Sequence, residues 1–260
     1  MRNLILASVA LAALPLCAST IPVGNSSFEN DAPGFGNPTG WTLFSSTTSP
    51  TFTDNVRIVV NNGSAYPVLS GVAGSQFVAV NLDHNFLSPS NPAIIVPPDG
   101  SLDGLVSDDL GTFAANMVYT LTANIGLSQA LGSLDAGLAL GTGAPTLADV
   151  FPAPGTSAFS SVLINASLLS GTALQSETIT LNTSLHPSLV GQAINVSLLF
   201  HSEYMYGRQA LFDDVTLSST LSAPEPSTLI LFTITGLLWS IRRAAVGFAG
   251  PRRGLAGAKL

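Results

Sequence analysis

Cysteine and charged residues are scarce in this chain of 260 residues. It has one cysteine, Cys17, and 9% of its residues are charged, against about a quarter in a typical soluble domain. A single cysteine forms no internal disulfide bond, so an exported form of the chain depends on its hydrophobic core or on a metal ion. Intrinsic disorder is excluded, because 46% of the residues are hydrophobic and disordered chains are charged and poor in apolar residues.

Positive charge is almost missing from the middle of the chain. Between residues 20 and 224, two arginines (Arg57 and Arg208) stand against 14 Asp and Glu residues, which gives a net charge of −12. Such a surface repels nucleic acid, because phosphate binding needs clustered Lys and Arg, and it repels acidic polysaccharides for the same reason. Neutral sugars and divalent cations are the ligands that this charge allows.

The first 19 residues have the pattern of a secretory signal peptide. Arg2 supplies a short basic region, residues 4–16 are apolar, and small residues follow. We expect cleavage near Ala18 or Ser19, which leaves a mature chain without cysteine. An uncleaved N-terminal anchor is the alternative, and either form is exported.

An apolar run over residues 229–241 predicts a short transmembrane helix. As a helix it would cover about 20 Å, less than the roughly 30 Å of a bilayer core. Arg242 and Arg243 follow at once, which does not suit a buried core helix but suits a membrane helix with its basic end in the cytoplasm. Residues 245–260 then form a basic tail.

The flanks of this run resemble a known sorting signal. Pro224, Glu225 and Pro226 precede it and the arginine pair follows it, so residues 223–244 resemble the PEP-CTERM signal of Gram-negative bacteria. In that family an exosortase, a transpeptidase-like membrane enzyme, reads the tail and is thought to remove it near Pro-Glu-Pro. The resemblance implies exosortase as a processing partner, a membrane-anchored precursor in the cell envelope, and a final location at the cell surface or in the extracellular matrix.

Residues 20–222 alternate apolar and polar residues with a period of two. This alternation is typical of half-buried strands, and turn signals separate the stretches. We expect one all-β domain, an antiparallel β-sandwich or jelly roll. Residues 132–154, rich in Gly, Ala and Pro, are expected to be a long loop or irregular hairpin; a linker between two small domains is the alternative. The alternating stretches are residues 56–60, 117–127, 162–168, 194–200 and 211–217.

The two ends of this domain resemble the galactose-binding-like jelly rolls of carbohydrate-binding modules. The first end reads Asn-Ser-Ser-Phe-Glu at residues 25–29, followed by Gly40-Trp41, and the last reads Phe-Asp-Asp-Val-Thr-Leu at residues 212–217. In that family the first and last strands lie close together and often hold a structural calcium ion. The resemblance therefore implies a Ca²⁺ site that contains Glu29 with Asp213 or Asp214.

The chemistry of these carboxylates agrees with a calcium site. Ca²⁺ takes six to eight oxygen ligands, carboxylates among them. By alternation, Asp213 shares a face with Val215 and Leu217 and is expected to point inward, where a carboxylate needs a cation or strong donors. The alternative is that Glu29 and the two aspartates cap turns and bind only water.

No catalytic motif is visible in the sequence. It lacks a Gly-x-Ser-x-Gly elbow and a His-Glu-x-x-His zinc motif. Trp41 is expected in the core, and Tyr204 and Tyr206 on an inner face, so no ligand-binding residue is assigned. We predict a structural or adhesive, non-enzymatic protein of the cell surface or matrix. The alternatives are a carbohydrate-binding module for neutral exopolysaccharide and a secreted glycan hydrolase that uses paired carboxylates.

Overall fold

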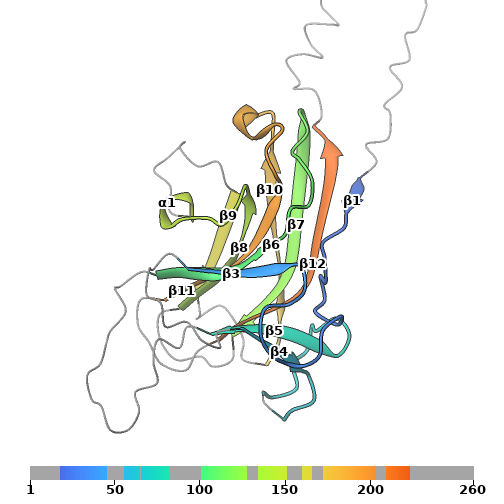
Figure 1. The fold of residues 1–260 in the computed structure, drawn as a ribbon, viewed down its shortest axis with the longest axis vertical. Helices are drawn as coiled ribbons and strands as arrows, with labels where there is room; N and C mark the ends of the chain where they lie inside the picture. The colour runs from blue at the N-terminus through green and yellow to red at the C-terminus, as the bar shows by residue number, and fades with distance from the viewer. Residues whose placement is uncertain are drawn as a thin grey trace, which may run out of the picture. The chain divides into compact units, whose positions relative to one another are not determined.

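The structure of this protein is a computed structural model, and its regular elements are nearly all β-strands (Figure 1). Two antiparallel sheets form a sandwich, which confirms the predicted fold class. Residues 1–221 form one compact unit and residues 222–260 a second, of which Ser222 alone is described. The described residues are 18–45, 56–64, 66–81, 101–127, 134–150, 160–165, 172–202 and 209–222.

The first sheet, sheet A, has seven strands. Six of them lie side by side in the order β10 (Gln175–Asn182), β7 (Met117–Leu127), β12 (Gln209–Leu221), β5 (Gln76–Asn81), β4 (Val56–Val60) and β2 (Gly34–Phe35), and the seventh, β1 (Ser19–Ile21), pairs with β12 off this path. One long edge of β12 pairs with β7. The other edge pairs with β5 over residues 209–212 and with β1 over residues 217–219. The strand β12 therefore changes partners midway.

The second sheet, sheet B, has five strands. Their order is β3 (Trp41–Ser45), β6 (Ser101–Ser107), β11 (Asn195–Ser202), β8 (Leu134–Gly141) and β9 (Ser160–Asn165). Within the described residues, two short helices accompany the strands, α1 (Leu147–Val150) and η2 (Pro187–Leu189). Residues 132–154, predicted to be a long loop or irregular hairpin, contain a regular strand, β8, which lies between β11 and β9 and pairs antiparallel with β9.

The main core lies between the two sheets. In β7, the alternate residues from Tyr119 to Leu127 are buried, as the period-two pattern predicts. The same holds for the alternate residues from Ile194, just before β11, to Phe200. Burying one such apolar side chain contributes about 1.5–3 kcal/mol, so this interior is the main source of stability in a chain without disulfide bonds.

Sheet A also has apolar residues on its outer face. A second cluster of buried residues forms there, covered in part by the chain that joins β4 to β5. Tyr66 and Val72 of that connection pack against it. The members of this outer cluster are Val59, Leu69, Phe77, Ala79, Leu174 and Leu211.

A β-bulge divides the faces of β12. Asp213 pairs with Asn124 and Thr216 with Thr122, so two residues of β12 oppose one of β7. Asp214, at φ 50°, has the left-handed backbone conformation within this bulge. The prediction that Asp213 points inward with Val215 is therefore wrong: Asp213 lies on the outer face with Leu211, and Val215 and the residues after it return to the register of the core.

Both predicted terminal helices lie outside the described residues. Neither the signal segment before residue 18 nor the apolar run at residues 229–241 is described. Within the described ranges, no helix is long and apolar enough to cross a membrane. The two helices therefore stay predictions.

Gly104 sets the spacing between β6 and β11. A Cβ atom at this position would lie 2.0 Å from the carbonyl oxygen of Leu198, which is backbone and cannot move away. We expect Gly104→Ala to lower the free energy of unfolding by about 1–3 kcal/mol, measured by urea denaturation. Gly24→Ala is the matched control, because its Cβ would meet its nearest atom at 3.9 Å; equal stability of the two variants would contradict the expectation.

Candidate functional site

The segment after β1 forms the wall of the first candidate site. Phe28, at φ 58°, is fully buried and packs on Trp41 with ring centres 5.8 Å apart. The indole N–H of Trp41 donates to the carbonyl oxygen of Gly24 at 3.0 Å. Trp41 is thus a core residue, as expected. Farther along, Ser26 accepts a hydrogen bond from Val215 of β12, so this segment fills the gap between β5 and β1.

Glu29 caps the start of β5. Its Oε1 accepts from the backbone N–H groups of Ser75 and Gln76, each at 2.6 Å, and its Oε2 accepts from the Ser75 hydroxyl at 2.9 Å. Burial of the carboxylate acts to raise its pKa, but the hydrogen bonds from Ser75 and Gln76 outweigh it and hold the pKa of Glu29 below the ordinary value. Gly74 completes the turn, at φ 83°, and a Cβ there would lie 2.6 Å from Glu29 Oε1.

Asp213 of β12 contacts the same loop, at Ala73. Its side chain is fully buried, and its Oδ2 accepts from the backbone N–H of Ala73 at 2.5 Å. Its Oδ1 is buried and has no hydrogen-bond partner. Burial raises the pKa of Asp213 to about 7, and the charges of Asp214 and Glu29 add to the rise, while backbone hydrogen bonds from Ala73 and Asp214 oppose it. This carboxyl group therefore titrates near neutral pH.

The structure thus brings Glu29 and Asp213 to one loop, residues 73–76. Asp214 is the exposed residue of the bulge. Within the part of the chain that the structure describes, no group of three or more His, Cys, Asp or Glu residues is placed to hold a metal ion. The loop instead presents N–H donors to the two carboxylates. The orphaned Oδ1 of Asp213 is the one observation that fits a cation at this place.

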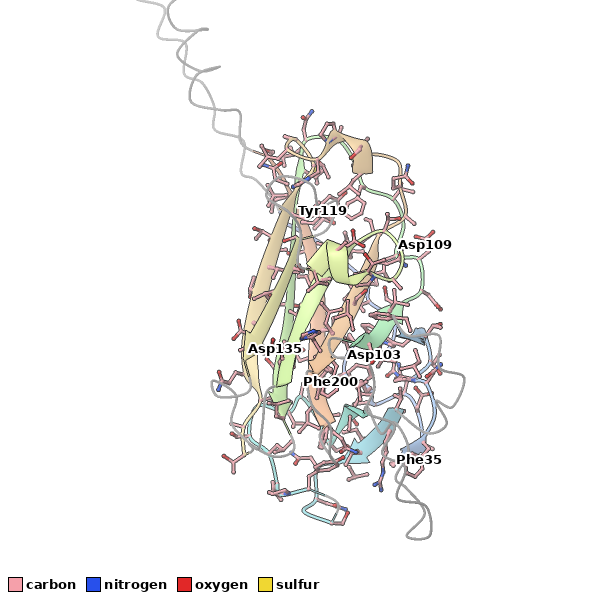
Figure 2. The ribbon with its side chains drawn as sticks, turned by 90° about the vertical axis from the view of Figure 1, so that its left-hand side faces the viewer. Phe35, Asp103, Asp109, Tyr119, Asp135 and Phe200 are labelled. Atoms are coloured by element: carbon pink, nitrogen blue, oxygen red, sulfur yellow. The ribbon has the colours of Figure 1, made fainter. Side chains whose placement is uncertain are left out.

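A second acidic residue, Asp103, lies between the two sheets. It is 1% exposed and stands on β6, directly opposite Phe200 of β11 (Figure 2). Residues opposite each other in an antiparallel pair share a face, and Phe200 belongs to the main core cluster. Asp103 therefore points into the interior of the sandwich, where carboxylates are rare.

Asp103 lies near one end of the sandwich. It is the third residue of β6 and pairs with Phe200 near the end of β11. The corresponding end of sheet A carries Val80, Leu127 and Ala210, which are fully or almost fully buried. Asp103 was not predicted from the sequence, although one signal was available. It lies two residues before the buried Leu105, so in a strand the two side chains lie on the same face.

An acid–base pair occupies the outer face of sheet B. His201 Nδ1 lies 3.7 Å from Asp135 Oδ2. His201 neighbours Phe200 in β11 and points to the opposite side of the sheet. It is therefore separated from Asp103 by the backbone of sheet B. Tyr204 and Tyr206 lie outside the described residues.

These features define a class: an antiparallel β-sandwich with a carboxyl group enclosed between its sheets. The model of the HpiC1-like family, described as HpiC1 cyclase, matches residues 19–218. The chain belongs to this HpiC1-like family. No curated protein matches the sequence.

Solved cyclases share the fold. One is a Stig cyclase, Fisc from Fischerella sp. TAU, in complex with (3Z)-3-(1-methyl-2-pyrrolidinylidene)-3H-indole; it is 19% identical, with a TM-score of 0.55 over 79% of this chain and 100% of that one. Another is a cyclase from Fischerella sp. TAU in complex with 4-(1H-indol-3-yl)butan-2-one; it is 17% identical, with a TM-score of 0.56 over 79% of this chain and 100% of that one.

The family match corrects the predicted family. The resemblance to PEP-CTERM proteins and to carbohydrate-binding modules is overturned, because the matched family covers the whole sandwich and is that of a cyclase. The PEP-CTERM resemblance covered about 20 residues, at residues 223–244, which lie outside the match and outside the described residues. Short motifs at two ends of a common sandwich do not distinguish its families.

The same finding corrects the predicted function. A structural or adhesive role without enzymatic activity is wrong, as are the alternatives of a carbohydrate-binding module and a glycan hydrolase, because the family is described by a cyclase. The predicted partners, exosortase and polysaccharide, are replaced by a small molecule. Composition excluded nucleic acid but carried no sign of a cyclisation site.

Proposed function

We propose that this protein is a cyclase that closes a ring in a small, largely apolar molecule between the two sheets. The observation that carries the proposal is Asp103, a carboxyl group enclosed in the interior of a sandwich that belongs to a cyclase family. The two solved cyclases hold indole compounds, and an indole ring suits an apolar interior. The substrate class proposed here is an indole with an unsaturated side chain.

The proposed reaction is an acid-catalysed isomerisation. The Asp103 carboxyl group donates a proton to the unsaturated side chain, which leaves a cation on carbon. Electrons of a second double bond or of the indole form the new ring bond. Loss of a proton back to the carboxylate restores the acid. Substrate and product have the same composition, so no oxidant or reductant takes part.

The surroundings of Asp103 suit this chemistry. Phe200 lies opposite Asp103 across the strand pair, and its ring would stabilise a cation formed there through its π face. The apolar residues at this end of the sandwich keep water away, and water would otherwise capture the cation and end the reaction as an alcohol. Ring closure within an enclosed site also gains from holding the reacting ends together.

Ligand binding tests the location. We expect 4-(1H-indol-3-yl)butan-2-one to bind the protein in isothermal titration calorimetry, and Phe200→Ala to raise its Kd at least tenfold. Leu199→Ala is the matched control, because Leu199 is equally buried but belongs to the cluster on the other face of sheet B. Equal loss of binding in both variants, or none in Phe200→Ala, would contradict a site between the sheets.

We also propose a structural calcium ion at residues 73–76. Glu29 and Asp213 would hold it, and the buried Asp213 Oδ1 supplies an oxygen that has no other partner. The ion would tie the segment before β2 to the last strand and to the start of β5. Because it requires an ionised Asp213, its effect on stability should grow as the pH rises toward neutrality.

Export remains a further proposal. The strand β1 begins at Ser19, directly after the predicted cleavage position, and pairs with β12. Cleavage near Ala18 would therefore leave this strand intact at the new N-terminus. N-terminal sequencing of the protein isolated from its host would test the position of cleavage.

A further inference from the structure

Arg57 is the only Lys or Arg among the residues that the structure describes. It stands on β4, opposite Phe35 of β2 and opposite Ala79 of β5. Ala79 belongs to the apolar cluster on the outer face of sheet A. Arg57 therefore presents its side chain on that outer face, away from the space that holds Asp103.

The guanidinium of Arg57 has no anionic partner in the described part of the chain. The one ion pair within the described ranges joins His201 and Asp135. The Nε atom of Arg57 is buried and donates no hydrogen bond. Leaving such a donor unmet costs about 1–3 kcal/mol, and more when the group is charged. An anion bound beside the guanidinium would balance its charge.

One aromatic ring lies against this guanidinium, and a second aromatic side chain lies within range of its charge. Its central carbon lies 5.3 Å from the centre of the Phe35 ring. Phe35 is 68% exposed, an unusual state for a phenylalanine, and Gly34 and Gly36 beside it have open space where a Cβ would lie. Tyr66 packs on the outer cluster of sheet A, edge-on against Phe77, with ring centres 5.6 Å apart. Burial raises the pKa of Tyr66, and the charge of Arg57 acts in the opposite direction.

We propose that Arg57, Phe35 and Tyr66 form a binding site for an organic carboxylate with a flat apolar body. The planar guanidinium matches a carboxylate with two parallel N–H···O bonds. The exposed face of Phe35 provides a surface for the ring of the ligand, and the Tyr66 hydroxyl is a further donor. A monoanion fits this domain better than a phosphate dianion does, because the strongly negative net charge of residues 20–224 opposes each added negative charge.

The site is independent of the proposed cyclisation. It lies on the outside of sheet A, whereas Asp103 lies between the sheets. Loss of cyclase activity in Asp103→Asn would leave it untouched, and loss of carboxylate binding would leave cyclisation untouched. The two proposals therefore fail separately.

Benzoate is the probe that tests the site. Benzamide, which has the same ring but no charge, is the control ligand. At low ionic strength we expect benzoate to bind the full chain in heteronuclear NMR titrations, with shifts at residues 34–36 and 56–60, and benzamide to bind at least tenfold more weakly. Arg57→Gln should raise the Kd for benzoate at least tenfold, and Phe35→Ala should raise it several-fold. Arg57→Lys should recover little, since an ammonium cannot form the two parallel bonds.

Ser188→Asp is the charge-matched control. It changes the net charge by the same amount as Arg57→Gln, at an exposed position of η2. Unchanged benzoate binding in Ser188→Asp, with melting temperatures close to wild type in all variants, supports the proposal. Equal binding of benzoate and benzamide, or an equal loss of benzoate binding in Ser188→Asp and Arg57→Gln, would overturn it.

Discussion

Asp103→Asn is expected to lower the rate of cyclisation by about 10²–10⁴-fold, the usual contribution of a positioned proton donor. The amide has nearly the same shape as the acid but cannot supply the proton. Binding of the indole ligand should change little, because the ring contacts remain. The loss should therefore appear in kcat rather than in KM.

The assay follows from the reaction type. Indoles with alkenyl side chains are incubated with the protein, and chromatography with mass detection counts products that have the same mass as the substrate but a different retention time. Asp109→Asn is the matched control, since Asp109 is exposed on the segment after β6. Turnover by Asp103→Asn at the wild-type rate would rule out Asp103 as the proton donor, and absence of any isomeric product from the wild type would count against the proposed substrate class.

In EDTA, which removes calcium, the free energy of unfolding is expected to fall by up to about 4 kcal/mol as the pH rises from 4 to 7. This fall is the effect of the deprotonation of Asp213 alone. The folded pKa of this group is about 7 and its ordinary value is 3.8. A raised folded pKa means that the folded state holds the proton more tightly, so its contribution is complete below pH 3.8 and is lost as the pH rises through 7. Each pH unit between the two values changes the free energy of unfolding by about 1.4 kcal/mol.

The difference between wild type and Asp213→Asn isolates this contribution. Urea denaturation from pH 4 to pH 8 should show that the variant lacks the decline, and a parallel decline in both proteins would contradict it. Glu29 has the opposite sign: its pKa is lowered, so its stabilisation is present above its ordinary value of 4.5 and is lost in acid. Calcium should restore the stability of the wild type at pH 7 and have no effect on Asp213→Asn; equal effects on both would remove the calcium proposal.

Periodicity predicted the strands well where apolar side chains are large. The buried face of β7 and that of β11 follow from alternation alone, because a period of two places every second residue on one side. The strand β8 was missed since its residues are mostly Ala, Gly and Leu, and Ala and Gly are poor indicators of a strand. Its place between β11 and β9 buries residues that its own sequence does not mark as a strand.

The site could be predicted only in part. The motif around Glu29 and the pair at residues 213–214 correctly predicted that the two ends of the domain meet, because they carry a local pattern. The face of Asp213 was predicted wrongly, since a bulge inserts one residue and alternation cannot detect it. Asp103 and Arg57 were singled out by their neighbours on paired strands, Phe200 and Phe35. Such pairings join residues far apart in the sequence and leave no local signal in it.

The order in which β12 acquires its partners has a consequence for the timing of folding. It is the last strand of the sandwich to be synthesised, yet it joins β7 on one side to β5 and β1 on the other. Within the described residues, no other strand of sheet A connects them. The pairing of Ser19 with Ser219 joins residues from opposite ends of the domain. Contacts over such separations form slowly. The domain is therefore expected to complete its fold only after translation has passed Leu221.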